Sequence, residues 1–246
     1  LKVGKARYGV MLREDGIVYD DGTTSRFAED RFFMTTTTAK AGPVMAYLER
    51  CLEIDWPELK VRVSSVSERW GGMAVAGPDA RATLIAAFPS VDFSNEAFPF
   101  MGVVHAEHNG AKLIFLRISF SGEMAFEVYA ESEHATDIWQ TIIDAGQVHD
   151  IVPYGLETLG ALRIEKGHVT GAELDGRATL GDVHMDGMAS KKKWFVGKNL
   201  KDREGLVHPD RPQLVGLKSV DPRTPIASGS ISVSYTHLRA HETQFD

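Results

Sequence analysis

The sequence predicts an α+β fold built from mixed or antiparallel sheets with flanking helices. Short β-branched and aromatic segments, separated by Glu-Asp-Gly and Asp-Asp-Gly turn signals, fill the first part of the chain. Amphipathic helix patterns occur later, between further strand segments. Because strands and helices do not alternate one by one, the pattern favours hairpin-built sheets over a doubly wound parallel sheet.

The first third of the chain predicts strands followed by a helix. Residues 8–38 read as successive strands, and Pro43 is well placed in the first turn of a helix that stops before Trp56. The apolar residues of that helix recur at helical spacing: Val44, Leu48, Cys51 and Leu52. Residues 61–66 alternate like a strand, and residues 72–88 predict a buried strand, a Gly-Pro break and a helix.

The middle of the chain carries the clearest helix signal. Residues 113–120 and 124–130 are expected strands on either side of a Ser-Gly turn, and a helix is expected over residues 132–146. Ser132 suits its N-cap and Gly146 its end. Its apolar stripe consists of Ala135, Ile138, Trp139, Ile142 and Ile143.

The last predicted elements are a helix and a strand. The helix runs from about Tyr154 to Lys166, and Gly167 closes it. Residues 212–220 return to a strand pattern, as if a β domain began there.

Composition excludes several classes of protein. The chain has 246 residues, 43% of them apolar and 25% charged, which is ordinary for a soluble globular protein. No apolar run approaches the ~20 residues of a membrane span, and a net charge of −7 argues against a nucleic-acid-binding face. The single cysteine, Cys51, fits a reducing compartment. We therefore expect a cytoplasmic protein with no nucleic-acid or membrane partner.

Common cofactor motifs are missing from the sequence. It has no GxGxxG, no P-loop, no GxSxG elbow and no metal-spaced Cys/His cluster. His105 and His108 are three residues apart in an expected strand and turn, where that spacing does not converge on a metal. No metal site is predicted.

Carboxylates in strand segments are more informative. Asp20 and Asp21 follow the apolar residues GIVY directly before Gly22, and a hairpin turn alone explains that pattern. Glu127 lies in the apolar run AFEV, where a solvated strand face and a ligand site explain it equally well. Residues and spacing alone leave these alternatives open.

Several segments resemble the glycine-cleavage T-protein (aminomethyltransferase) superfamily. RISFSGEMAFEV resembles its R-x-G-Y-T-G-E-x-G-x-E segment, MAVAGPDARATL its A-L-Q-G-P turn, and WFVGKNL its F-x-G-K-x-x-L segment. Within the superfamily, YGVMLREDGIVYDDGTTSR, FFMTTTTAKAG and VPYGLETLGALRIEKGHVTGAELDGR are similar to the C-terminal region of the α-subunit family of heterotetrameric sarcosine oxidases. The resemblance runs from about Tyr8 to about Pro225.

The resemblance implies a folate site and assigns residues to it. Asp20, four residues after Gly16, matches the aspartate beside the reacting nitrogens of tetrahydrofolate, and Asp21 would share that role if the alignment is shifted by one. Glu127 matches the glutamate that grips the pterin ring, and Phe120 stands at an aromatic position of the pocket. Glu123 would instead bond the backbone of the Ser-Gly turn.

Some positions depart from the T-protein pattern. Its second-helix arginine, which helps to hold folate, falls on Leu159. Two strand positions after its aspartate fall on Gly22 and Thr24, so Thr24 is an expected folate neighbour. Arg163 matches a retained segment, and either ligand binding or a structural pair with Glu165 explains it.

The implied function is folate-dependent one-carbon transfer within an oxidoreductase. Sarcosine would be oxidised at a flavin elsewhere, and tetrahydrofolate would capture the iminium methylene here, giving 5,10-methylenetetrahydrofolate and glycine. FAD, FMN, NAD and the other subunits would lie outside this segment. The alternatives are a stand-alone aminomethyltransferase and a non-catalytic folate-binding or subunit-docking module, and Leu159 favours the latter.

The expected domain division follows from the resemblance. Residues 1–205 would form the aminomethyltransferase-like folate-binding domain, and residues 206–232 the truncated start of a C-terminal β-barrel. Residues 233–246 match the translation of a transposase-based sequencing adapter, with Val233 to Thr243 agreeing codon by codon. We expect a fragment truncated at both ends, whose tail histidines carry no function.

Overall fold

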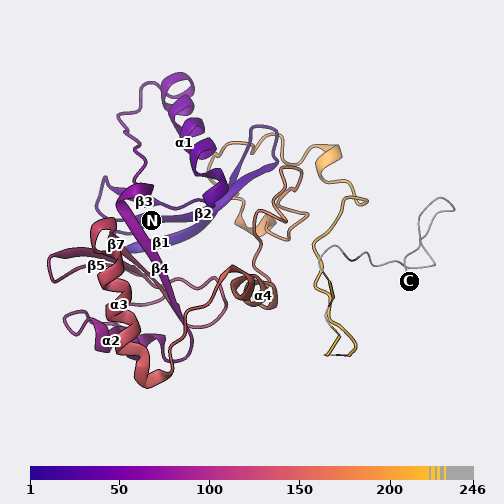
Figure 1. Cartoon of the computed structure of the whole chain (residues 1–246). Coiled ribbons are helices and arrows are strands. Elements are labelled where there is room, and N and C mark those ends of the chain that lie inside the picture. Colours follow the sequence, from indigo (N-terminus) through magenta and orange to yellow (C-terminus); the bar gives the residue numbers. More distant parts are fainter. Residues whose placement is uncertain (222, 225, 228–229, 231–246) are drawn as a thin grey trace. The chain divides into compact units, whose positions relative to one another are not determined.

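Two antiparallel sheets organise the described part of the chain, as the computed structural model shows (Figure 1). The structure describes residues 1–221, 223–224, 226–227 and 230. The chain divides into one unit from Leu1 to Gln213 and another from Leu214 to Asp246. All elements below belong to the first unit.

The first sheet has the order β1-β2-β3. It comprises β1 (Lys5–Leu12), β2 (Val18–Arg26) and β3 (Phe32–Met34). β1 and β2 form a hairpin whose register pairs Ala6 with Ser25 and Val10 with Asp21. The strands predicted within residues 8–38 are therefore confirmed, with the last of them ending at Met34.

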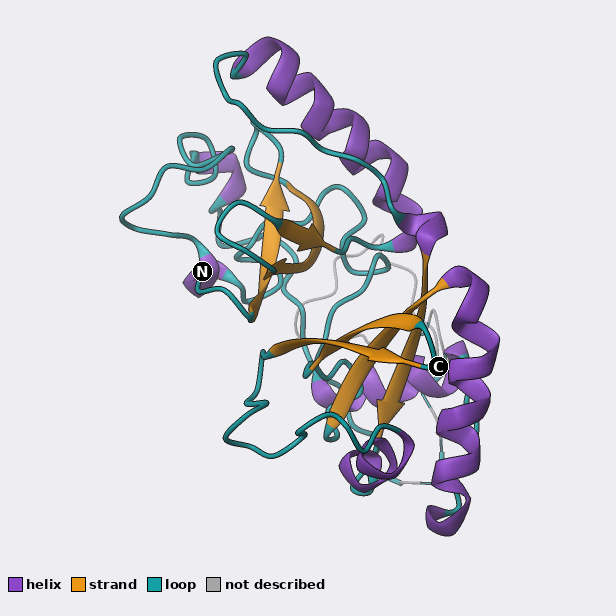
Figure 2. Cartoon of the chain, turned by 90° about the vertical axis from the view of Figure 1, so that its left-hand side faces the viewer, coloured by secondary structure: helices purple, strands orange, loops and turns teal. Residues whose placement is uncertain are grey.

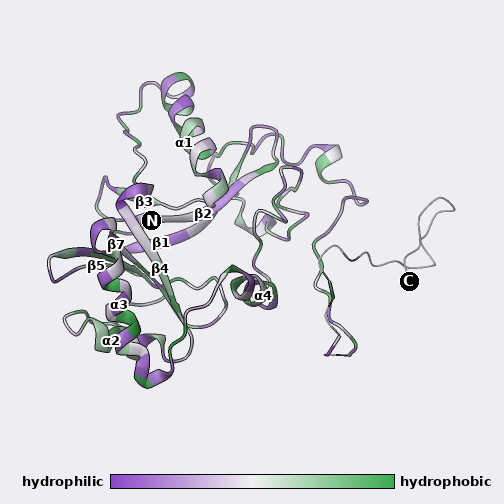
Figure 3. Cartoon of the chain, viewed as in Figure 1, coloured by the Kyte–Doolittle hydropathy of each residue, from purple (hydrophilic) through white to green (hydrophobic). Residues whose placement is uncertain are grey.

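The second sheet has the order β4-β7-β6-β5. Figure 2 shows the strands of the chain with helices lying beside them. Its strands are β4 (Trp70–Ala76), β5 (Val103–His108), β6 (Ala111–Leu116) and β7 (Ala125–Glu131). Helices α2 (Ala80–Ala87) and α3 (Ala135–Gly146) pack on one face of this sheet. Their shared core contains the buried aromatic residues Phe88, Phe93, Phe98, Phe115 and Phe126. Figure 3 shows apolar and polar residues alternating along α3, as its predicted amphipathic stripe requires.

The opposite face of the second sheet meets the first sheet. Ala6 of β1 packs in one cluster with Val103, Ile114 and Leu116. A bridge between Lys5 and Gly102 joins the edges of the two sheets. Because alternate residues of a strand point to opposite faces, this contact fixes which side chains of β1 and β2 face the second sheet.

Helices and short turns complete the fold. α1 spans Ala41–Arg50 and continues as a short π-helix at Cys51–Asp55, while α4 spans Leu156–Lys166 and ends at Gly167 with φ 83°. Single 3₁₀ turns are Thr38–Lys40, Ser67–Arg69, Ser132–His134, Gln147–His149, Asp186–Met188 and Glu204–Leu206. Among the described residues, no helix is both long and apolar enough to cross a membrane.

Four local predictions were wrong. Residues 61–66 and 212–220 form no strand, because an alternating pattern gives a strand only where a neighbouring strand supplies backbone hydrogen bonds. Ser132 begins a 3₁₀ turn instead of capping α3, and its hydroxyl donates to the Glu68 carbonyl at 2.7 Å. Residues 117–120 also lie outside the strands, so the segment RISFSGEMAFEV is a loop that enters β7.

Gly22 allows the chain after β3 to pack against β2. A Cβ atom at this position would lie 1.9 Å from the carbonyl oxygen of Thr35. We expect Gly22→Ala to lower the free energy of unfolding by about 2 kcal/mol or more, because backbone atoms must shift to admit the methyl group. Urea unfolding measures this loss.

Gly9 provides the matched control, because it is paired directly with Gly22 in the hairpin. A Cβ atom there meets nothing within 4 Å. Gly9→Ala should therefore leave stability nearly unchanged, and equal losses in the two variants would contradict the packing argument.

Candidate functional site

Asp20 and Asp21 point to opposite faces of the first sheet, because they are neighbours on β2. Asp20 is buried, and its carboxylate accepts hydrogen bonds from the Thr37 backbone N–H at 3.1 Å and the Thr37 hydroxyl at 2.7 Å. These bonds tie the segment after β3 to the sheet. The contacts of Asp20 are those of a structural carboxylate.

Asp21 lies on the face that is turned toward the second sheet. It shares this face with Ser25, whose strand partner Ala6 packs against β5 and β6. The Tyr8 hydroxyl donates to Asp21 Oδ2 at 2.8 Å, while Oδ1 is buried and has no hydrogen-bond partner among the described residues. Burial raises the pKa of Asp21, and the negative charge of Asp20 raises it further.

Glu127 lies on the facing side of the second sheet. It shares its strand face with Tyr129, whose ring makes an edge contact with Phe33 of the first sheet at 5.5 Å between centroids. The Tyr129 hydroxyl donates to Glu127 Oε2 at 2.7 Å. Burial raises the pKa of Glu127, and the hydrogen bond from Tyr129 offsets part of that rise.

The loop before β7 exposes an aromatic ring. Phe120 stacks on His168 with 5.6 Å between ring centroids, and its carbonyl lies 2.8 Å from His168 Nδ1. The Ser-Gly turn is held by Ser119, whose Oγ accepts a hydrogen bond from the Gly122 N–H at 3.0 Å. Glu123 is exposed and makes no hydrogen bond among the described residues, so the predicted bracing role was wrong.

Arg163 and Thr24, the two remaining candidates, lie in surroundings that do not favour ligand binding. Arg163 forms an ion pair with Glu173 at 2.8 Å and donates to the His168 carbonyl at 3.2 Å. Its acidic partner is thus Glu173 and not Glu165. Thr24 lies on the same face of β2 as Asp20, opposite to Asp21.

Sequence patterns missed the two tyrosines that hold the carboxylates. Tyr129 is two residues after Glu127 on the same strand. Side chains two residues apart on a strand point to the same face, so the sequence could have predicted this contact. Tyr8 reaches Asp21 across the hairpin, and only the register of the pairing reveals that contact.

The arrangement presents two desolvated carboxylates on facing sides of the two sheets. Each accepts one hydrogen bond from a tyrosine, so oxygen lone pairs remain for a further donor. A carboxylate in such surroundings can accept hydrogen bonds from adjacent N–H and NH₂ groups of a ligand ring, stabilise a nearby cation or accept a proton.

Comparisons of the sequence find named relatives of this chain. The α subunit of sarcosine oxidase from Rhizobium meliloti (strain 1021) is 50% identical over 94% of the chain, and that from Corynebacterium sp. (strain U-96) is 44% identical over 95%. The chain spans only 24% of the length of each relative.

A solved structure confirms the predicted fold. The glycine cleavage system aminomethyltransferase T from Bartonella henselae superposes with a TM-score of 0.70 at 24% identity, covering 81% of this chain and 52% of that one. The model of the GCVT N-terminal domain matches residues 1–193. The chain therefore belongs to the family of the GCVT N-terminal domain.

Proposed function

We propose that this chain is the tetrahydrofolate-dependent one-carbon transfer part of a sarcosine oxidase α subunit. The observation that carries the proposal is the pair of desolvated carboxylates, the buried Asp21 and the half-buried Glu127, on facing sides of the two sheets. Identity of 50% to a named sarcosine oxidase α subunit supports the choice of enzyme.

Glu127 would bind the pterin ring through hydrogen bonds. Two carboxylate oxygens match the paired N–H and NH₂ donors of a pterin edge, in the same forked geometry as an arginine–carboxylate pair. The hydroxyl of Tyr129 donates to Glu127 Oε2 at 2.7 Å and would hold the carboxylate in place. Phe120, a residue that is 36% exposed, would line the pocket as an aromatic contact.

We assign the catalytic carboxylate to Asp21 rather than Asp20. The iminium carbon is electrophilic and its nitrogen cationic, so a nearby anion stabilises it and orients the attacking folate nitrogen. Asp21 Oδ1 has no partner among the described residues, whereas both oxygens of Asp20 accept hydrogen bonds from Thr37. Tyr8 holds Asp21 in place.

Tetrahydrofolate supplies the nucleophilic nitrogens that accept the methylene group. The proposed products are 5,10-methylenetetrahydrofolate and glycine. FAD, FMN and NAD would bind elsewhere in the full enzyme, and the partners would be the sarcosine-derived iminium and the other sarcosine oxidase subunits. We place the protein in the cytoplasm, with residues 1–205 as the folate domain and residues 206–232 as the start of a β-barrel. The adapter-like segment 233–246 lies outside the described residues.

A non-catalytic folate-binding or docking module is the second candidate. Leu159 of α4, in place of the T-protein arginine, favours it, and so do the contacts of Arg163, which is already paired with Glu173. A stand-alone aminomethyltransferase is a weaker candidate, because the chain is 50% identical to a sarcosine oxidase α subunit and 30% identical to the aminomethyltransferase of Chlorobium chlorochromatii (strain CaD3).

The deciding experiment follows the fate of the sarcosine carbon in the full-length protein. With tetrahydrofolate present, we expect 5,10-methylenetetrahydrofolate to accumulate and free formaldehyde to fall in proportion. Chromatography of folates together with a formaldehyde assay measures both. Full release of formaldehyde at every folate concentration would exclude the transfer function, and folate binding without transfer would identify a non-catalytic module.

A further inference from the structure

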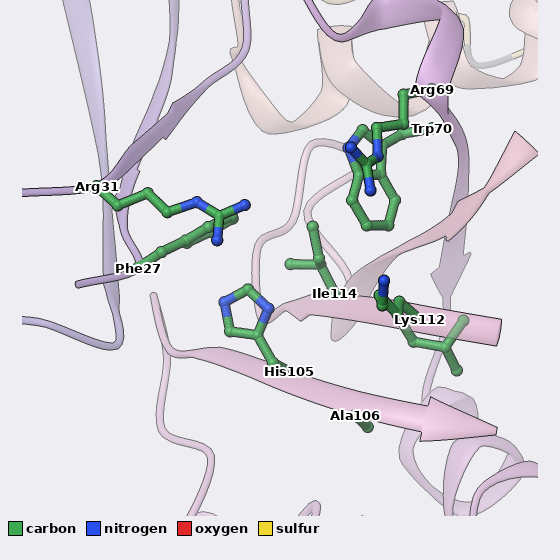
Figure 4. A pocket seen from close by; sticks show the side chains of 9 residues that line it. Phe27, Arg31, Arg69, Trp70, His105, Ala106, Lys112 and Ile114 are labelled. Atoms are coloured by element: carbon green, nitrogen blue, oxygen red, sulfur yellow. The ribbon is translucent and has the colours of Figure 1, made fainter. Parts of the chain in front are cut away.

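A cavity lies between the second sheet and the segment that joins β2 to β3, and neither Asp21 nor Glu127 lines it. Its volume is about 360 Å³, within the size range of small-molecule sites. Phe27 and Trp70 contribute aromatic walls, and Arg31, Arg69 and Lys112 contribute positive charges. Figure 4 shows the charged groups of Arg31, Arg69 and Lys112 and the ring of His105 extending around the same space.

The charges of this cavity do not balance within the described residues. Glu131 accepts from Arg69 at 3.2 Å and lies 3.8 Å from Lys112, so one carboxylate serves two cations. Arg31 has no carboxylate within ion-pair distance in the described part of the chain, and its guanidinium lies 6.0 Å from the centroid of the Phe27 ring. The cavity therefore carries an excess of positive charge.

His105 lies close to the positive charge of Arg31. Its ring packs edge-on against Phe27, with 4.4 Å between centroids. Burial lowers the pKa of His105, and the positive charge of Arg31 lowers it further. A neutral imidazole beside Arg31 leaves one ring nitrogen to donate a hydrogen bond to an anion.

Side chains of the inter-sheet core separate this cavity from Glu127. The cavity lies at the Trp70–Glu131 end of the pairing between β4 and β7, whereas Glu127 pairs with Ala74, four residues further along. Tyr129 stands between them on the same strand face, with its ring against Phe33. The cavity is thus distinct from the proposed pterin site.

We propose that this cavity binds a small molecule with an oxyanion head, either a carboxylate or a phosphate, and an apolar or planar body. Arg31 and Arg69 provide forked N–H donors that match either oxyanion, and Lys112 adds a point charge. Phe27 and Trp70 provide the surfaces against which the body would pack. The site is additional to the proposed one-carbon chemistry.

Calorimetry on the full-length protein tests this proposal, with inorganic phosphate and glutarate as separate probes at low ionic strength. We expect at least one of them to bind, and the stronger binder identifies the class of head group. Arg31→Ala should weaken that binding by about tenfold, since a hydrogen bond to a charged group contributes roughly that factor. Arg31→Lys should restore part of it.

Arg62 provides the matched control, because it is an exposed arginine outside the cavity. Arg62→Ala changes net charge by the same amount and should leave the affinity for phosphate and glutarate unchanged. Absence of binding by both probes would overturn the proposal. Equal weakening in Arg31→Ala and Arg62→Ala would overturn it as well, because it would reveal only a general charge effect. Folate affinity should be unaltered in Arg31→Ala, whether or not the proposed one-carbon transfer is correct.

Discussion

Replacing Asp21 with asparagine is expected to slow one-carbon transfer to tetrahydrofolate by about 10²–10⁴-fold, the usual contribution of a positioned acid or base. The substitution keeps the shape of the side chain and the contact with Tyr8, but it removes the negative charge that faces the second sheet. The rate of 5,10-methylenetetrahydrofolate formation by the full-length protein measures the effect.

The folded state should tolerate Asp21→Asn. Burial raises the pKa of Asp21, so the folded protein penalises the charged form. A raised carboxyl pKa stabilises the fold fully below the unfolded pKa, and this contribution is lost as the pH rises through the folded pKa. Removing the charge should therefore not lower stability at neutral pH.

Asp20→Asn is the matched control for the catalytic assignment. It weakens the two hydrogen bonds to Thr37, so we expect a loss of about 1–3 kcal/mol in unfolding free energy. Transfer by the remaining folded protein should stay close to the wild-type rate. The opposite result, with transfer lost in Asp20→Asn and retained in Asp21→Asn, would return the catalytic role to Asp20.

Replacing Glu127 with glutamine is expected to weaken tetrahydrofolate binding by about 10- to 100-fold. The carboxylate of Glu127 can accept two hydrogen bonds from the pterin edge. Glutamine is neutral, and its NH₂ group would face a pterin donor where the carboxylate has an acceptor oxygen. Titration of the full-length protein with tetrahydrofolate, followed by calorimetry, measures the change in Kd.

Stability separates a binding role of Glu127 from a structural one. Burial raises the pKa of Glu127, so the glutamine variant should unfold at the same or a higher temperature at neutral pH. Glu123→Gln, in an exposed residue of the same segment, should change neither stability nor affinity. Unchanged folate affinity in Glu127→Gln would remove Glu127 from the pterin site.

Strand and helix identities could be predicted where local signals were complete. The hairpin of β1 and β2 follows from β-branched residues around Gly-containing turns, and α3 follows from its apolar stripe and from Gly146. Residues 61–66 had the alternation of a strand without a partner to pair with. Pairing is a property of distant residues, so the local pattern could not exclude that segment.

The sequence by itself determined the α+β class, the chain order of the main elements and, through resemblance, the family. It also singled out Asp20, Asp21 and Glu127 as carboxylates in unusual surroundings. The tertiary structure alone decided which of the two aspartates faces the second sheet, because one residue of register on a strand reverses the side chain. It alone brought Arg31, Arg69 and Lys112 to one cavity, since those residues come from segments that only the packing of the two sheets places together.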